Sequence, residues 1–292
     1  MDRRLTPANG SVAHAALKGK VEAAAFVAPT RHMIAVPVAP LLSQPAISAP
    51  RDRELAFGEG FDVLEKRNGW AFGQATRDGY VGYVPEDVLA TDFLTPTHRV
   101  IAPTYWRSEP RLKSAYEPMP LPIGAKVSVR TSHHDHCDWA EIDWPATSPD
   151  STGSAVYVPM PQLLPLDQIA TDPVAEAERY LGIPYLWAGN SGFGIDCSGL
   201  VQAALLACDI PCPGDSDLQE AAFAVASGGY KRGDLLFWKG HVAFVADPDR
   251  LIHANAHHMA VAYEPIADTI SRIAAQDGGP VTSHKRPSQE AP

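Results

Sequence analysis

The residue best suited to covalent chemistry is a cysteine at the expected start of a helix. Cys197 is the second residue of an Asp-Cys-Ser-Gly sequence, and a mostly apolar run follows it as far as Cys208. Pro211 ends this run, which predicts a helix that begins at Cys197. Thiolate is the nucleophilic form of cysteine, and the N–H groups and dipole at a helix N-terminus favour it. The sequence therefore predicts a nucleophilic thiol with a lowered pKa.

A thiol nucleophile needs a base, and two histidines follow at a suitable distance along the chain. His241 begins the apolar run to Ala246, and His253 stands in the run from Leu251, so both are expected on strands. The order cysteine, histidine, polar residue is that of papain-type peptidases. Spacing alone leaves another interpretation open, because a histidine on an apolar strand is more often a core residue.

Composition limits what else the chain does. Its 292 residues exceed a typical single domain, and its formal net charge of −10 argues against a nucleic-acid partner. Its four cysteines are scattered without a CxxC pair, unlike a disulfide framework. It lacks a P-loop, a dinucleotide fingerprint and an H-E-x-x-H motif, so we expect no cofactor.

The N-terminal residues lack the pattern of a signal peptide. Lys18, Lys20 and Glu22 interrupt the run from Val12 to Val27. Nowhere does the chain reach the roughly 20 consecutive apolar residues that span a bilayer. We therefore expect no membrane insertion and a cytoplasmic protein.

Changes in residue composition and in the expected secondary structure along the chain predict a multidomain protein. Residues 1–30 are Ala-rich with a weak helical signal and are interpreted as an N-terminal extension. Short β-type runs and turns over 31–95, among them Asn68-Gly69, predict a small SH3-like β-barrel, and the same pattern over 96–166 predicts a second one. Residues 167–292 carry helices first and strands afterwards, which is typical of an α+β domain.

The last domain should hold two further helices besides the one at Cys197. Asp172, followed by proline, predicts a helix to about Leu181. Another is expected from Leu218 to Ala226. The expected strands are 234–238, 241–246, 251–254 and 261–263.

Six motifs in the right order resemble the NlpC family of cell-wall cysteine peptidases. They cover about 170–265 and read, in chain order, Tyr185-Leu-Trp-Ala-Gly-Asn, Gly194-Ile-Asp-Cys-Ser-Gly-Leu-Val-Gln, Asp215-Ser-Asp-Leu-Gln, Arg232-Gly-Asp-Leu-Leu-Phe-Trp, Gly240-His-Val-Ala-Phe and Ile252-His-Ala. Ala188 departs from the family, which usually has glycine after the tryptophan. The whole layout resembles the γ-D-glutamyl-L-diamino-acid endopeptidases that degrade and recycle murein peptides.

The resemblance implies a complete catalytic set and no metal. Cys197 would be the nucleophile, His241 the base and His253 the residue that orients the base. The hydroxyl of Tyr185 and the backbone N–H of Cys197 would stabilise the oxyanion.

The resemblance also implies a substrate, a murein tripeptide or longer stem peptide with a free N-terminal L-Ala. Asp196, Ser198 and Ser216 would line its pocket. Tyr80 and Glu59 of the first SH3-like domain would close that pocket against larger substrates.

Several of these residues have simpler explanations. Asp196 and Ser216 are also good helix N-caps, and Tyr80 could be a surface aromatic residue. The run His133-His-Asp-His-Cys137 has the residue types of a metal site, but neighbours on one short loop rarely converge on one ion.

Two other functions fit the same residues. One is an acyltransferase or amidase that uses the same cysteine–histidine pair on another substrate. The other is a wall-peptide binding protein with a vestigial site, which the intact set of Cys197, His241 and His253 argues against.

Overall fold

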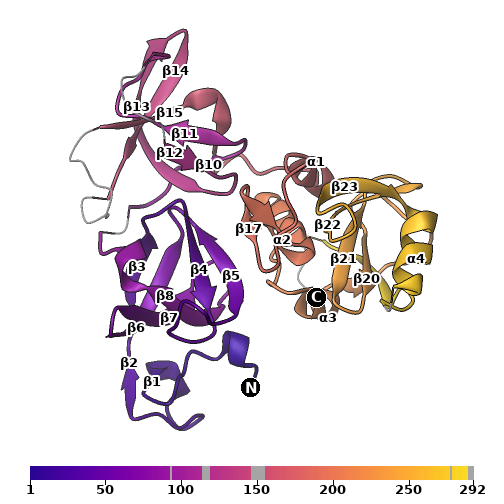
Figure 1. The fold of residues 1–292 in the computed structure, drawn as a ribbon, viewed down its shortest axis with the longest axis horizontal. Helices are drawn as coiled ribbons and strands as arrows, with labels where there is room; N and C mark the ends of the chain where they lie inside the picture. Colours follow the sequence, from indigo (N-terminus) through magenta and orange to yellow (C-terminus); the bar gives the residue numbers. More distant parts are fainter. Residues whose placement is uncertain (93, 114–118, 146–154, 277, 289–292) are drawn as a thin grey trace. The chain divides into compact units, whose positions relative to one another are not determined.

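The computed structural model describes residues 1–92, 94–113, 119–145, 155–276 and 278–288 (Figure 1). The chain divides into two compact units, Met1–Asp167 and Gln168–Pro292. The regular structure of the first unit consists of strands and short 3₁₀ turns, and the second unit combines α-helices with a six-stranded sheet and a small hairpin.

The first unit begins with a strongly curved seven-stranded sheet of order β5-β4-β8-β7-β6-β3-β9. Its strands are β3 (Thr30–Ile34), β4 (Val38–Leu42), β5 (Arg51–Ala56), β6 (Gly60–Arg67), β7 (Trp70–Ala75), β8 (Val81–Pro85) and β9 (Leu89–Ala90), with a 3₁₀ turn at Glu86–Val88. Asn68 and Gly69 join β6 to β7 with positive φ angles of 53° and 79°. This is the two-residue hairpin that an Asn-Gly pair favours, so that prediction is confirmed.

The sequence from Met33 to Val38 has the apolar character of a single strand, but it belongs to two. β3 ends at Ile34 and β4 begins at Val38. Pro37 lies between them, and a proline has no N–H to donate to a strand ladder.

The N-terminal thirty residues are not helical beyond two short 3₁₀ turns, Arg3–Leu5 and Ala15–Leu17. Two parallel strands lie between and after these turns, β1 (Val12–His14) and β2 (Ala25–Val27). Val12 is buried in a cluster with Leu64, Phe72 and Val81 of the sheet. This burial outweighs the weak helical propensity of the alanines, so the segment packs on the barrel.

A second sheet, of order β15-β14-β13-β10-β16, follows in the same unit. Its strands are β10 (His98–Val100), β13 (Lys126–Asp135), β14 (Cys137–Asp143), β15 (Val156–Pro159) and β16 (Leu163–Pro165), beside the pair β11 (Thr104–Trp106) and β12 (Met119–Leu121) and the 3₁₀ turn Met160–Gln162. Met33 and Phe57 of the first sheet are buried in the hydrophobic core of the second. The two sheets therefore share a core.

Gly58 permits this close packing, and we expect Gly58→Ala to destabilise the first unit strongly. Its φ is +82°, and a Cβ there would lie 2.0 Å from the carbonyl oxygen of Lys126. Left-handed strain alone costs about 1–2 kcal/mol, and displacing backbone should raise the loss to about 3 kcal/mol or more. Denaturant unfolding measures it. Gly69→Ala is the matched control, because Gly69 has φ +79° and nothing within 4 Å of its Cβ position. Equal losses in both variants would contradict the packing argument.

The second unit places a six-stranded sheet between helices (Figure 1). The sheet has the order β19-β24-β20-β21-β22-β23, with strands β19 (Ala224–Val225), β20 (Leu235–Trp238), β21 (His241–Val245), β22 (Arg250–Asn255), β23 (Ala260–Pro265) and β24 (Ser283–Arg286). The helices are α1 (Pro173–Glu178), α2 (Cys197–Ala207), α3 (Ser216–Ala222) and α4 (Ile266–Ala275), and a small hairpin joins β17 (Asn190–Ser191) to β18 (Gly194–Ile195). Helix α2 contacts β21 and β22, and α4 contacts β23.

Most elements of this unit were predicted, with different ends. Oδ1 of Asp172 accepts hydrogen bonds from the first turn of α1, as expected, but α1 ends at Glu178 rather than near Leu181. Helix α3 spans Ser216–Ala222 instead of 218–226. Helix α4 and strand β24 had no counterpart in the predictions. Among the described residues, no helix is both long and apolar enough to cross a bilayer.

Candidate active site

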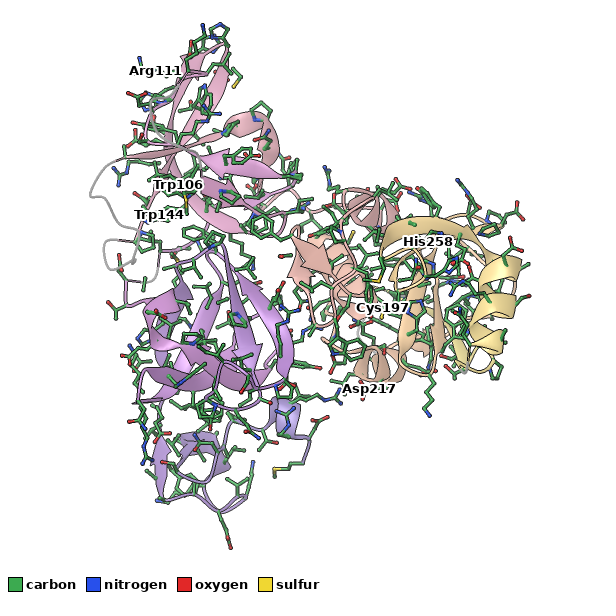
Figure 2. All side chains as sticks on the ribbon, in the orientation of Figure 1. Trp106, Arg111, Trp144, Cys197, Asp217 and His258 are labelled. Atoms are coloured by element: carbon green, nitrogen blue, oxygen red, sulfur yellow. The ribbon has the colours of Figure 1, made fainter. Side chains whose placement is uncertain are left out.

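Cys197 is the first residue of α2, and the residues around it fix the start of that helix (Figure 2). Asp196 is the N-cap, as its sequence position suggested. Its Oδ1 accepts a 2.6 Å hydrogen bond from the N–H of Gly199 and a 3.0 Å bond from the hydroxyl of Ser198. A Cβ on Gly199 would lie 2.6 Å from the carbonyl oxygen of Gly189, so only glycine fits there.

The thiol of Cys197 is buried against the strand that carries His241. Its side chain faces the backbone N–H of Val242 on β21 and of Ser198 on α2, both of which stabilise a thiolate. Burial nevertheless raises the pKa of Cys197 to about 12, and the charge of Asp196 adds to the effect. The sequence predicted a lowered pKa. That direction is wrong for the free protein because burial outweighs the helix N-terminus.

His241 begins β21, is partly buried, and lies next to a second histidine. Its Nε2 lies 2.9 Å from Nδ1 of His253 on β22. Burial lowers the pKa of His241 to about 3, with smaller contributions from His253 and from the charge of Arg272. The thiol of Cys197 and this imidazole are therefore both neutral at rest. His241 is suited to act as a general base during attack rather than as one half of a preformed ion pair.

Two residues on the side of His253 away from His241, Glu264 and Arg272, were not predicted from the sequence. Nε2 of His253 lies 3.1 Å from Oε2 of Glu264 on β23, and Arg272 of α4 binds both oxygens of that carboxylate. A signal was available, because Glu264 is a single acid at the end of an apolar strand. The predicted strand stopped one residue short, at Tyr263.

Tyr185 lies on the segment that runs beside Ile195, just before Asp196. Its N–H donates to the carbonyl of Met259, and it forms a parallel bridge with Ile195. Burial raises the pKa of Tyr185, and the negative charges of Asp196 and of Cys197 in its thiolate form add to the effect, so the phenol stays protonated and remains a hydrogen-bond donor. This is the property that an oxyanion donor requires.

Ala188, where the family resemblance leads one to expect glycine, has a positive φ of 59°. Such a conformation costs alanine about 1–2 kcal/mol relative to glycine. The substitution therefore adds strain to the loop without preventing its fold.

Ser216 is the first residue of α3, not its N-cap, because Asp215 occupies the cap position. Gln219, also on α3, donates from Nε2 to the carbonyl oxygen of Ser198 at 2.9 Å and to that of Pro213 at 2.9 Å. These bonds tie α3, the helix that Ser216 begins, to the first turn of α2. The sequence did not reveal this role of Gln219.

Glu59 and Tyr80 lie in the first unit, and both are buried. The carboxylate of Glu59 accepts hydrogen bonds from Arg77 at 3.0 Å and from the N–H of Ala56 at 3.1 Å. Tyr80 is 1% exposed, so it is not a surface aromatic residue. The guanidinium of Arg53 lies 5.4 Å from the centre of its ring.

The histidine-rich run at 133–137 spans the turn between β13 and β14. His133, His134 and His136 each pair with a separate carboxylate, those of Glu141, Asp138 and Asp135. Over the described ranges, no three His, Cys, Asp or Glu side chains are grouped as metal ligands.

A comparison with protein families accounts for the arrangement of Cys197, His241 and His253. Residues 182–273 match the NlpC/P60 family, and the match includes Tyr185, Cys197, His241 and His253. The chain carries an NlpC/P60 domain. It is a cysteine peptidase. Residues 41–89 match the bacterial dipeptidyl-peptidase Sh3 domain, so an SH3 domain precedes the NlpC/P60 domain.

Curated relatives extend the likeness over most of the chain. A γ-D-glutamyl-L-lysine dipeptidyl-peptidase of Bacillus cereus is 26% identical over 248 residues, which cover 74% of this chain and 70% of the relative. Dipeptidyl-peptidase 6 of Lysinibacillus sphaericus is 26% identical over 75% of this chain and 85% of its own.

A solved structure, an NlpC/P60 family protein from Bacillus cereus, superposes with a TM-score of 0.70. It is 20% identical and covers 88% of this chain and 99% of its own length. At this identity the likeness supports the fold, an SH3-type domain with a papain-like NlpC/P60 domain.

Proposed function

We propose that the protein hydrolyses the γ-D-Glu to diamino-acid bond of free murein stem peptides that begin with L-Ala. Its relatives support hydrolysis of peptidoglycan peptides as the general activity. The observation that carries the proposal is the placement of Cys197 at the start of α2, against the backbone N–H of Val242. Val242 follows His241, which is hydrogen-bonded to His253.

In the first step, Sγ of Cys197 attacks the γ-carbonyl carbon of D-Glu while its proton passes to Nδ1 of His241. The carbonyl oxygen becomes an oxyanion, which the backbone N–H of Cys197 and the hydroxyl of Tyr185 stabilise. The C–N bond then breaks, and the imidazolium of His241 returns the proton to the leaving amine of the diamino acid. The product is a thioester on Cys197.

In the second step, water attacks the thioester carbonyl. His241 takes one proton from the water and passes it to the thiolate of Cys197 as the C–S bond breaks. The L-Ala-D-Glu dipeptide leaves with its γ-carboxyl group free, and both side chains return to their neutral resting forms.

The free amine of the substrate requires a negative partner, and Asp196 is the first candidate. Its carboxylate lies next to the nucleophile and also caps α2, two roles that are compatible. Ser198 and Ser216 are neighbours of suitable polarity. Glu59 and Tyr80 remain proposed contributors from the SH3 domain, with the carboxylate of Glu59 already engaged by Arg77.

We also infer that residues 96–166 form a second SH3-like domain between the extension and first barrel at 1–95 and the peptidase domain at 167–292. Support comes from the short antiparallel strands of its five-stranded sheet and from the apolar residues that it contributes to the core shared with the first sheet.

We expect N-acetylation of the substrate to reduce its cleavage severely. An acylated amine leaves the binding carboxylate desolvated and unpaired, at a cost of about 2–5 kcal/mol. That is a loss of roughly thirty- to several-thousand-fold in kcat/KM. The measurement compares L-Ala-γ-D-Glu-diaminopimelate with its N-acetyl form, with products identified by mass spectrometry.

Two further arms make that experiment decisive. Intact sacculi should yield no soluble peptides, and EDTA should leave the rate unchanged. Comparable kcat/KM for the two tripeptides, or digestion of sacculi, would remove the requirement for a free N-terminal L-Ala. Amide formation with added amines in place of hydrolysis would favour an acyltransferase.

A further inference from the structure

A chain of hydrogen bonds, buried at its centre and partly buried at its ends, runs from His241 through two strands to helix α4. Nε2 of His241 lies 2.9 Å from Nδ1 of His253, and Nε2 of His253 lies 3.1 Å from Oε2 of Glu264. Arg272 binds Oε1 and Oε2 of Glu264 at 2.8 and 2.6 Å. The side chains of His253 and Glu264 are 0% and 8% exposed, so water competes little for these bonds.

Regular secondary structure holds every member of this chain in place. His253 on β22 pairs with Ala262 on β23, and Glu264 follows two residues later, so both side chains lie on one face of the sheet. Arg272 precedes Ile273, which anchors α4 in the core of the same unit. Helix α4 lies along the sheet in Figure 1. The geometry therefore does not depend on a loop.

Glu264 is ionised in this setting. Burial by itself raises the pKa of Glu264, but hydrogen bonds from His253 and Arg272 and the charge of Arg272 bring that pKa well below its usual range. An ionised carboxylate can only accept hydrogen bonds. Nε2 of His253 must therefore carry a proton.

The proton on Nε2 of His253 determines which nitrogen of His241 carries a proton. Burial lowers the pKa of both His253 and His241, so each ring is neutral and has one donor and one acceptor nitrogen. Nδ1 of His253 is then the acceptor, and Nε2 of His241 must be the donor. The remaining nitrogen of His241, Nδ1, is left with its lone pair, which is the state a general base needs.

We propose that Glu264, held by Arg272, is a positioning residue that fixes the tautomers of His253 and His241 and so presents an unprotonated Nδ1 to the thiol of Cys197. This inference rests on the catalytic roles proposed above for Cys197 and His241. A purely structural role is the rival explanation, since the pair Glu264–Arg272 also ties α4 to β23. The two explanations differ in what they predict for the histidine rings.

The first test uses the unaltered protein. Nitrogen NMR of the full chain labelled with ¹⁵N-histidine, at neutral pH, reports which nitrogen of each ring is protonated. We expect the Nε2-protonated form for both His241 and His253, with assignments from His241→Gln and His253→Gln spectra. A His253 protonated on Nδ1 would overturn the proposal, whatever any variant does.

The second test is Glu264→Gln, which keeps the shape but allows the side chain to donate as well as accept. The histidine tautomers should become mixed, and kcat should fall about tenfold to 1000-fold with little change in KM. Alkylation of Cys197 by iodoacetamide at pH 7, followed by peptide mapping, should slow in parallel. Its readout needs no substrate, so a wrong assignment of the murein peptide would not affect it.

Glu178→Gln is the matched control for the loss of a paired carboxylate. Glu178 accepts hydrogen bonds from Arg232 and from the hydroxyl of Tyr263, which precedes Glu264 on the same strand. This variant should keep wild-type kcat, alkylation rate and histidine spectra. If Glu264→Gln lost only melting temperature while its tautomers and alkylation rate matched those of the wild type, Glu264 would be structural alone.

Discussion

Cys197→Ala is expected to abolish peptide hydrolysis while leaving the fold in place. Without the thiol no thioester can form, and His241 has no proton to accept. Loss of a catalytic nucleophile typically costs about 10⁴-fold or more in kcat. The side chain is small and 6% exposed, so its truncation should cost only about 1 kcal/mol of stability. Mass spectrometry of tripeptide digests measures the first quantity, and thermal unfolding the second.

Cys208→Ala is the control for removing a buried thiol. Cys208 is the C-cap at the other end of α2 and is 2% exposed, so the two variants lose similar buried groups. The Cys208 variant should hydrolyse the tripeptide at the wild-type rate. Hydrolysis by purified Cys197→Ala above a trace would refute the proposed mechanism.

The sequence predicted those parts of the site whose geometry is set by residues close together along the chain. Asp196 and Gly199 set the start of α2 through contacts within four residues, so the position of Cys197 was readable from its own motif. His241 and His253 each stand in an apolar run that forms one strand. Motif resemblance then assigned their roles, which local pattern alone left open.

The parts that sequence missed depend on contacts between distant segments. Glu264 acquires its importance from His253 and Arg272, and no periodic pattern links an acid on one strand to a histidine on the next. Gln219 reaches Ser198 across 21 positions. The pKa of Cys197 is a similar case, because its burial by β21 is invisible in the Asp-Cys-Ser-Gly motif.

The prediction of weak helical structure in the N-terminal segment was wrong for a related reason. Its alanines favour helix weakly, but Val12 gains more by packing beside Leu64 and Phe72 of the barrel. Local propensity therefore produced a full helix at α2, where a capping motif supported it, but at the N-terminus the caps Asp2 and His14 begin only 3₁₀ turns of three residues. One SH3 domain and the NlpC/P60 domain were nevertheless predicted, because each carries its own local patterns.

His241→Ala should be nearly as damaging as loss of the nucleophile. The thiol of Cys197 has a pKa of about 12, so almost none is ionised at neutral pH and attack depends on a base. A general base contributes about 10²- to 10⁴-fold, and the loss should fall on kcat rather than KM. His253→Ala should cost less, because His253 orients the base without taking the proton.

Two comparisons separate loss of the base from general damage. His257→Ala removes an exposed histidine of the same unit and should leave kcat unchanged. Added imidazole should partly restore the His241 variant, because a free base can enter the space left by the ring, and it should not restore Cys197→Ala. Since the pKa of His241 is about 3, the wild-type base stays unprotonated well below pH 6.5, and kcat should not fall as the pH drops from 7.5 to 6. Full activity of His241→Ala would show that His241 does not accept the proton of Cys197. It would exclude the mechanism in which a neutral imidazole activates a neutral thiol.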